Sequence, residues 1–182
     1  MSAHLESKHQ RAFEQQLDLD GNGYIERTDF VAFGVRVLSA CESSPTSAKG
    51  KALVGAVLDV WEALRAQCDI DGDGRISPQE YHRGMTGAFV DEGGGYDRAF
   101  HPAVRAVLEL ADADGDGTIT PQEFRALQAA LGTPDDEVDA AFQRLDAENR
   151  GVLDIDQIDA AARQFYTGEG QEAAGDLLFG AS

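Results

Sequence analysis

Residues 112–123 read DADGDGTITPQE, a stretch in which aspartates recur at every second position. Every specified position fits the pattern D-x-[DN]-x-[DN]-G-x5-E, in which side-chain and backbone oxygens surround one cation. The residues in its ligand positions are Asp112, Asp114, Asp116, Thr118 through its backbone carbonyl, and Glu123. Oxygen ligands without His or Cys favour a hard divalent cation over zinc or copper. The stretch therefore predicts a site for Ca2+ or Mg2+.

The same stretch also reads as the start of a helix. Thr120 would be the N-cap, Pro121 the first helical residue, and Glu123 the third residue of a capping box. A helix start alone does not explain three aspartates on alternate residues, because their repulsion is unfavourable without a cation between them. Gly117 can take the positive φ that the sharp turn of such a loop needs. We therefore expect a metal loop and a capping box together.

The register of this loop recurs three more times along the chain. Residues 69–80 (DIDGDGRISPQE) match fully, residues 18–29 (DLDGNGYIERTD) match except for the final Asp, and residues 146–157 (DAENRGVLDIDQ) keep little more than the first Asp and the Gly. We number these loops 1 to 4 in chain order, so that residues 112–123 are loop 3. The predicted ligands of loop 2 are Asp69, Asp71, Asp73, Arg75 through its carbonyl, and Glu80. Those of loop 1 are Asp18, Asp20, Asn22, Tyr24 through its carbonyl, and Asp29.

With these loops the chain resembles the EF-hand superfamily, and the arrangement of its repeats is similar to that of sarcoplasmic calcium-binding proteins and calerythrin-like bacterial proteins. The resemblance implies an all-α fold of four EF-hands in two pairs, forming a compact globule with short β bridges between the loops. Paired EF-hands usually align the aliphatic residue at position 8 of each loop. We therefore expect Ile25 to face Ile76 and Ile119 to face Leu153.

Loop 1 differs from loops 2 and 3 at its last position. Asp29 is one methylene shorter than Glu, so it reaches a large ion with both oxygens less easily, which favours the smaller Mg2+. Glu26 at position 9 adds a carboxylate, and we expect loop 1 to bind Ca2+ more weakly or to exchange it with Mg2+. An empty loop 1 is the alternative.

Loop 4 lacks two of the strongest contributions to metal binding. Arg150 places a cation at ligand position 5, and Gln157 replaces the bidentate carboxylate at position 12. We expect three ions in loops 1, 2 and 3, and we expect loop 4 to be the structural partner of loop 3.

Breaks in the helical pattern divide the chain. We expect a first EF-hand pair at residues 1–90, a glycine-rich linker at 91–97, a second pair at 98–166 and a tail at 167–182. The expected helices span about residues 2–17, 27–39, 51–67, 78–89, 98–111, 124–131 and 135–145, with a last helix ending near Tyr166. Apolar residues of the tail either dock over a groove or belong to a frayed terminus.

The chain has 182 residues and a formal net charge of −18, which argues against binding to nucleic acids or anionic membranes. Its two cysteines, Cys41 and Cys68, are too few for a disulfide framework and are expected to be reduced. The N-terminal residues lack the features of a signal peptide, and no apolar run is long enough to span a bilayer. We expect a soluble, monomeric, cytoplasmic protein.

The side chains that carry enzyme chemistry form no recognisable set. The four histidines are scattered, and no Ser or Cys stands in the setting of a nucleophile, so we expect no enzyme. Two functions remain open: a calcium buffer or transporter, and a sensor that binds a target protein when loaded. Sensors of the calmodulin type expose a Met-rich groove, whereas this chain has only Met85 besides Met1. We favour the buffer.

Overall fold

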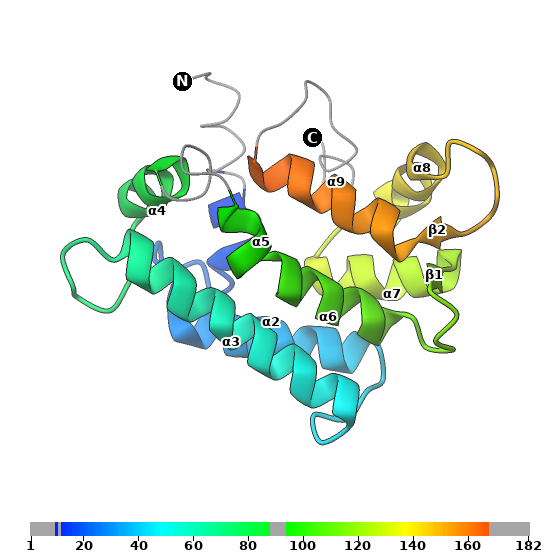
Figure 1. The fold of residues 1–182 in the computed structure, drawn as a ribbon, viewed down its shortest axis with the longest axis horizontal. Helices are drawn as coiled ribbons and strands as arrows, with labels where there is room; N and C mark the ends of the chain where they lie inside the picture. Colours follow the sequence, from blue (N-terminus) through cyan, green and yellow to red (C-terminus); the bar gives the residue numbers. More distant parts are fainter. Residues whose placement is uncertain (1–9, 11, 88–93, 168–182) are drawn as a thin grey trace.

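The described part of the chain folds almost entirely into helices. The computed structural model describes residues 10, 12–87 and 94–167 (Figure 1). Its helices are η1 (Phe13–Leu17), α2 (Arg27–Ala40), α3 (Ala48–Cys68), α4 (Pro78–Gly84), α5 (Gly95–Ala99), α6 (His101–Ala111), α7 (Pro121–Leu131), α8 (Asp135–Leu145) and α9 (Ile155–Thr167). The strands are β1 (Thr118–Ile119) and β2 (Leu153–Asp154). The expected all-α class is confirmed.

Three helices begin directly after a loop through reciprocal capping. Ser77 caps α4 and Thr120 caps α7, each with a Glu at the third helical position and Pro at the start of the helix. In α2 the partners are Glu26 and Asp29. In each helix the acidic residue at the third helical position is also the last residue of the preceding loop. The start of the helix therefore fixes the position of the loop's last carboxylate.

The loops pair through short antiparallel contacts, as predicted. Ile25 and Ile76 form an isolated bridge, in which each backbone N–H donates to the other residue's carbonyl at 2.9 and 3.0 Å. Ile119 faces Leu153 between β1 and β2. All four side chains are fully buried, which explains why aliphatic residues occupy these positions.

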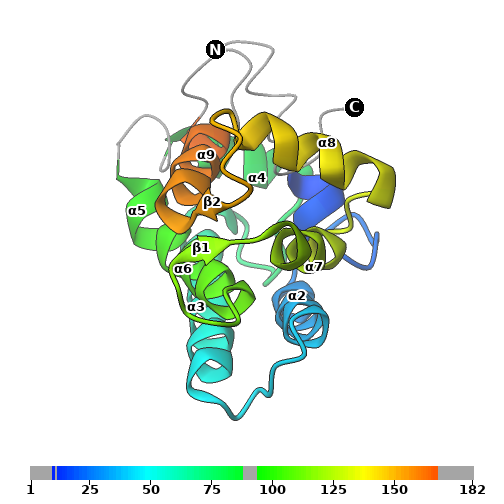
Figure 2. The same cartoon turned by 90° about the vertical axis from the view of Figure 1, so that its right-hand side faces the viewer.

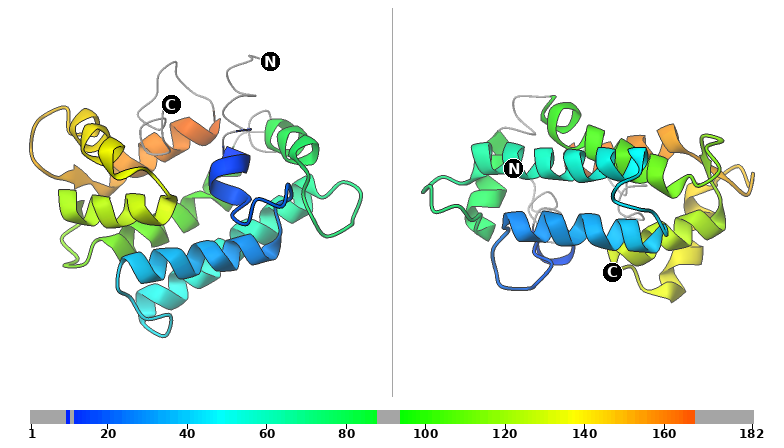
Figure 3. Two further views of the ribbon diagram at one scale, coloured as in Figure 1. Left: turned by 180° about the vertical axis from the view of Figure 1, so that it is seen from behind. Right: turned by 90° about the horizontal axis from the view of Figure 1, so that it is seen from below.

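One hydrophobic core joins both halves of the chain. Helix α3 packs against α2 and α6, α2 also packs against α7, and α9 lies on α6 (Figure 2). Seen from below, α2 and α3 run side by side beneath the rest of the molecule (Figure 3). Aromatic pairs fix these contacts, with Phe30 5.9 Å from Trp61 and Phe124 5.4 Å from Phe142 between ring centroids.

Several helix boundaries differ from the expected ones. Helix α3 begins at Ala48, because the Ser47 hydroxyl accepts a hydrogen bond from the Gly50 N–H at 2.9 Å and caps it. Helix α5 begins at Gly95, inside the stretch expected as a linker. The buried Tyr96 side chain donates to Asp159 at 2.9 Å, and this tertiary contact outweighs the low helix propensity of glycine.

The chain breaks again between α5 and α6, at Phe100, since Pro102 fits only in the first turn of a helix. Most of the helix expected at 2–17, the end of the one expected at 78–89, residues 91–93 of the linker and almost all of the tail at 167–182 lie outside the described residues. The division at 91–97 stays a prediction. Among the described helices, none combines the length and apolar character needed to cross a membrane.

Candidate metal centres

Three of the four loops gather carboxylates at one point. The groups whose oxygens lie within 4.8 Å of one another are Asp18, Asp20 and Asp29 in loop 1, Asp69, Asp71 and Asp73 in loop 2, and Asp112, Asp114 and Glu123 in loop 3. Such an all-oxygen set fits the donor preference of Ca2+ or Mg2+. The predicted ligands Glu80 and Asp116 lie in the same loops but outside these tight sets.

In loop 3 the backbone folds around the carboxylate of Asp112. Its Oδ1 accepts from the N–H groups of Gly115 at 2.7 Å and Asp116 at 3.2 Å, and its Oδ2 accepts from Gly117 at 3.0 Å. Gly117 has φ of 85° there, as its place in the pattern required. Burial raises the pKa of Asp112, but these hydrogen bonds outweigh it and leave the pKa below its usual value. The hydrogen bonds therefore favour the carboxylate form of Asp112.

The carboxylate of Glu123 closes loop 3 from the start of α7. Its Oε1 accepts from the Ala113 N–H at 2.9 Å, and its Oε2 accepts from the N–H and the hydroxyl of Thr120 at 2.9 and 2.8 Å. Both oxygens are thus held in place by neighbouring donors. The predicted capping box is therefore confirmed, and the carboxylate that forms it is the one predicted at the twelfth ligand position, whose role as a ligand stays a prediction.

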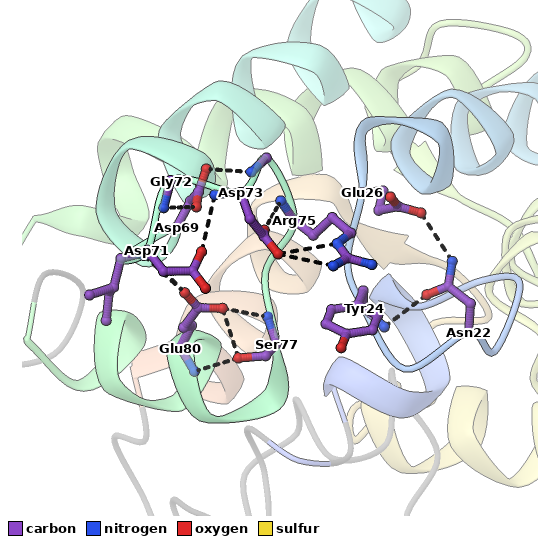
Figure 4. A network of polar contacts seen from close by, with 12 residues as sticks. Asn22, Tyr24, Glu26, Asp69, Asp71, Gly72, Asp73, Arg75, Ser77 and Glu80 are labelled. Atoms are coloured by element: carbon purple, nitrogen blue, oxygen red, sulfur yellow. Dashed lines mark hydrogen bonds and ion pairs between the residues drawn. The ribbon is translucent and has the colours of Figure 1, made fainter.

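Loop 2 repeats this arrangement (Figure 4). Asp69 accepts from the N–H groups of Gly72 at 2.9 Å and Gly74 at 3.2 Å, and Glu80 accepts from Ile70 at 3.1 Å and Ser77 at 2.9 Å. Burial raises the pKa of Glu80. The hydrogen bonds from Ser77 and from the loop N–H groups lower it by more, so the pKa lies below its usual value.

Sequence reasoning missed the side chain of Arg75, which was expected to contribute only its carbonyl. Its Nη2 lies 3.1 Å from Asp73 Oδ2, and its guanidinium carbon lies 4.2 Å from the centroid of the Tyr24 ring in loop 1 (Figure 4). A cation thus stands next to ligand position 5 of loop 2. The sequence could have indicated the ion pair, because Arg75 follows Asp73 by two residues. The contact with Tyr24 could not be predicted in this way, because it depends on the pairing of loops 1 and 2.

In loop 1 the shorter Asp29 still reaches the cluster. Its side chain is only 3% exposed, and its oxygens accept from the N–H groups of Leu19 at 3.1 Å and Glu26 at 2.7 Å. Burial raises its pKa, and the nearby Asp20 and Asp18 add to this increase. The two hydrogen bonds from Glu26 and Leu19 lower the pKa of Asp29, but they do not offset these effects, so its pKa lies above its usual value.

Asn22 links the remaining polar groups of loop 1. Its amide nitrogen donates to Asp20 at 3.1 Å and to Glu26 at 3.0 Å, while its Oδ1 accepts from the Tyr24 N–H at 2.9 Å. The carboxylate of Glu26, at position 9, therefore faces Asn22 and is not one of the three clustered carboxylates of loop 1. The roles of the Tyr24, Arg75 and Thr118 carbonyls as ligands stay predictions.

Loop 4 has the same backbone but a different centre. Asp146 accepts from the N–H groups of Arg150 at 2.8 Å and Gly151 at 2.7 Å, as Asp112 does in loop 3. The Arg150 guanidinium then donates to Asp154 at 2.5 Å. Gln157 points back and donates to the Leu145 carbonyl at 2.6 Å. In the described residues, the acidic groups of loop 4 form no cluster like those of the other loops.

Comparisons with known proteins agree with this geometry. Residues 15–33, 66–85 and 104–128 match the EF hand family, and these segments contain loops 1, 2 and 3. Calerythrin from Saccharopolyspora erythraea is 28% identical over 152 residues, which are 83% of this chain and 86% of that protein.

Two solved structures share the fold along most of the chain. A Streptomyces coelicolor calcium-binding protein, described for prokaryotic calcium-mediated regulation, is 29% identical with a TM-score of 0.75 and covers 91% of this chain and 99% of its own. A sarcoplasmic calcium-binding protein from amphioxus, 20% identical, has a TM-score of 0.76 over 100% of this chain and 99% of its own. Three segments of the chain thus match the EF hand family, the chain resembles calerythrin over most of its length, and it binds calcium through these EF-hand motifs.

Proposed function

We propose that this protein binds three Ca2+ ions, in loops 1, 2 and 3, and acts mainly as a calcium buffer or transporter. The observation that carries the proposal is the convergence of carboxylate oxygens within 4.8 Å in each of these loops. We propose that Mg2+ competes most strongly at loop 1, where the last ligand is Asp29. EF-hand proteins are generally non-enzymatic, and we propose no catalysis here. We further propose that the protein acts as a monomer in the cytoplasm.

The side chains of the exiting helices favour a buffer over a sensor. Met85 is fully buried, so it offers no adaptable surface for a target. Phe30 and Phe124 are also buried, and each packs against an aromatic residue of another helix. A groove of the calmodulin type would have to separate these rings, at the cost of apolar surface already removed from water.

A sensor that binds a target protein is the second candidate. The S. coelicolor relative with a role in calcium-mediated regulation supports it. So does the surface of α2, where Val31 and Val35 lie one turn apart and are 42% and 59% exposed. Two exposed valines are a small patch, which is why we place this candidate second.

Calcium titration by calorimetry, with and without Mg2+, tests the number of sites. We expect three bound Ca2+ ions, with Mg2+ weakening one binding step more than the others. A pull-down from a cell extract in Ca2+ and in chelator, combined with a dye for exposed apolar surface, tests the role. A partner retained only in Ca2+, with a large rise in dye binding, would replace the buffer by the sensor.

A further inference from the structure

An apolar cavity of about 110 Å³ lies between α2, α3, α6, α7, α9 and η1. Among the described residues that line it, all are apolar except Gln16, Asp29 and Tyr166. An engineered apolar cavity of about 150 Å³ remains dry and binds benzene. The cavity here is somewhat smaller but partly open to the surface, and its lining suits a single aromatic ring or a smaller apolar group.

The side-chain amide of Gln16 lines this cavity, and only one of its two polar atoms has a hydrogen-bond partner among the described residues. The side chain is 9% exposed, and its Oε1 accepts a hydrogen bond from the Tyr166 hydroxyl at 3.1 Å. Tyr166 is itself fixed by stacking on Phe100, with ring centroids 4.5 Å apart. The Gln16 Nε2 has no hydrogen-bond partner among the described residues. A buried amide N–H without an acceptor is unfavourable, so an acceptor placed in the cavity would be stabilised.

The other polar groups define the charge of a suitable ligand. Both carboxylate oxygens of Asp29 accept from loop N–H groups, so this side chain contributes a nearby negative charge and no free donor. No described Lys or Arg lines the cavity. An anion would lose its hydration without a counter-charge from any described lining residue, and a hydrogen-bond donor would leave Gln16 Nε2 unpaired.

We propose that this cavity binds a neutral, single-ring apolar molecule that carries one hydrogen-bond acceptor, such as a carbonyl oxygen, paired with Gln16 Nε2. This activity goes beyond calcium binding, because none of the apolar lining residues is a metal ligand. Tyr166 acts as a positioning residue, since its hydroxyl holds the Gln16 Oε1 and leaves the Nε2 for the ligand.

Acetophenone and ethylbenzene form a matched pair of probes, since they share the ring and nearly the same size but only acetophenone has an acceptor. Binding to the calcium-loaded protein is measured by calorimetry and by ligand-observed NMR. We expect both probes to bind, and Gln16→Leu to reduce the affinity for acetophenone relative to that for ethylbenzene by about tenfold, the scale of one net hydrogen bond. An unchanged ratio would remove the role of Gln16.

Filling the cavity provides the second arm. Ala103 lines the cavity, whereas Ala106, on the same helix, does not. Ala103→Leu should abolish binding of both probes, and Ala106→Leu should leave it unchanged. Both variants are compared by their calcium stoichiometry and far-ultraviolet circular dichroism, which report whether they fold.

NMR on the unmodified protein keeps the test independent of the variants. Acetophenone protons should give intermolecular NOEs to the methyl groups of Ile158 and Leu127, which line the cavity. If neither probe binds up to its solubility limit, or if a bound probe gives NOEs elsewhere and none to these methyl groups, the proposal is wrong.

Discussion

Loops 3 and 4 face each other across β1 and β2, and their backbones fold in the same way around an aspartate at the first position. In loop 3 the side chains that follow add carboxylates. In loop 4 the guanidinium of Arg150 pairs with Asp154, and Gln157 turns to a backbone carbonyl. The carboxylates of loop 3 are arranged for a metal cation from solution, whereas loop 4 contains its own positive charge, the guanidinium of Arg150.

This difference separates the shape of an EF-hand loop from its ability to hold an ion. The shape needs an acceptor at position 1 and a residue of positive φ at position 6, which are Asp146 and Gly151 in loop 4. Metal binding needs further side-chain oxygens at positions 3, 5 and 12, mostly from carboxylates and, at position 5 of loop 1, from Asn22. Loop 4 can therefore support the β bridge of loop 3 under conditions in which loop 3 has lost its ion.

We expect removal of the ions to give the largest difference between loop 4 and the other three loops. Without cations, the clustered carboxylates repel one another in loops 1, 2 and 3, whereas loop 4 keeps its internal pair. At free Ca2+ about 100-fold above the dissociation constant, each site contributes about 2.7 kcal/mol to stability. For three sites we expect chelation to lower Tm by more than about 10 °C.

Differential scanning calorimetry at constant ionic strength measures this shift, and hydrogen exchange compares the Gly117 and Gly151 amides. We expect Gly117 to lose more of its protection than Gly151. A chelated protein that melts within about two degrees of the loaded one would contradict the prediction.

Substituting the last position of each loop should have the next largest effect. Glu123→Gln removes the bidentate carboxylate of loop 3, and the number of bound Ca2+ ions in a titration should fall by one. Glu80→Gln should do the same for loop 2. Gln157→Ala is the matched control in loop 4 and should leave the number unchanged; a control that also loses an ion would show that loop 4 binds metal.

Loop 4 can be altered to resemble loop 3. The double variant Arg150→Asp with Gln157→Glu replaces the internal cation by a carboxylate and restores the twelfth ligand. We expect one additional Ca2+ per chain, bound more weakly than the others, and a larger fall of Tm on chelation than in the parent protein. An unchanged stoichiometry would mean that the backbone of loop 4, rather than these two side chains, prevents binding.

The smallest effect concerns loop 2, which combines features of both. Arg75 pairs with the ligand Asp73 there, but the contact is exposed, so solvent screens most of it. Arg75→Ala should increase the Ca2+ affinity of loop 2 by a few-fold at low salt and by less at high salt. Arg65→Ala removes an exposed pair with Glu62 in the last turn of α3, outside the loop, and serves as the control for overall charge. An equal increase in that variant would contradict a specific effect of the pair between Arg75 and Asp73.

Local patterns explain what the sequence predicted well. Helix α8 spans residues 135–145 as expected, and α4 begins at the predicted Pro78, because prolines and short acidic runs mark helix starts over a few residues. The facing of Ile119 and Leu153 also follows from their shared position in the loops. These features depend on neighbours in the chain or on a repeat.

Contacts between distant residues left no such signal. The position of Arg75 over Tyr24, the start of α5 at Gly95 and the hydrogen bond from Lys49 Nζ to the Asp112 carbonyl at 2.7 Å all depend on how helices pack. The apolar cavity belongs to the same class, since its lining residues come from six helices and the segment between α5 and α6. Periodicity identifies apolar faces, but it does not tell where they fail to fill the space between them.

The hydrogen bond between Tyr166 and Gln16 cannot form during synthesis until Tyr166 has been added to the chain. Its two residues lie 150 positions apart. A ribosome that adds about 5–20 residues per second needs roughly 8 to 30 seconds to cover that distance. For part of that interval α2 and α3 have been made while α6 and α9, which belong to the same core, have not, and their apolar faces remain exposed. The nascent protein therefore finishes folding only when α9 has left the ribosome.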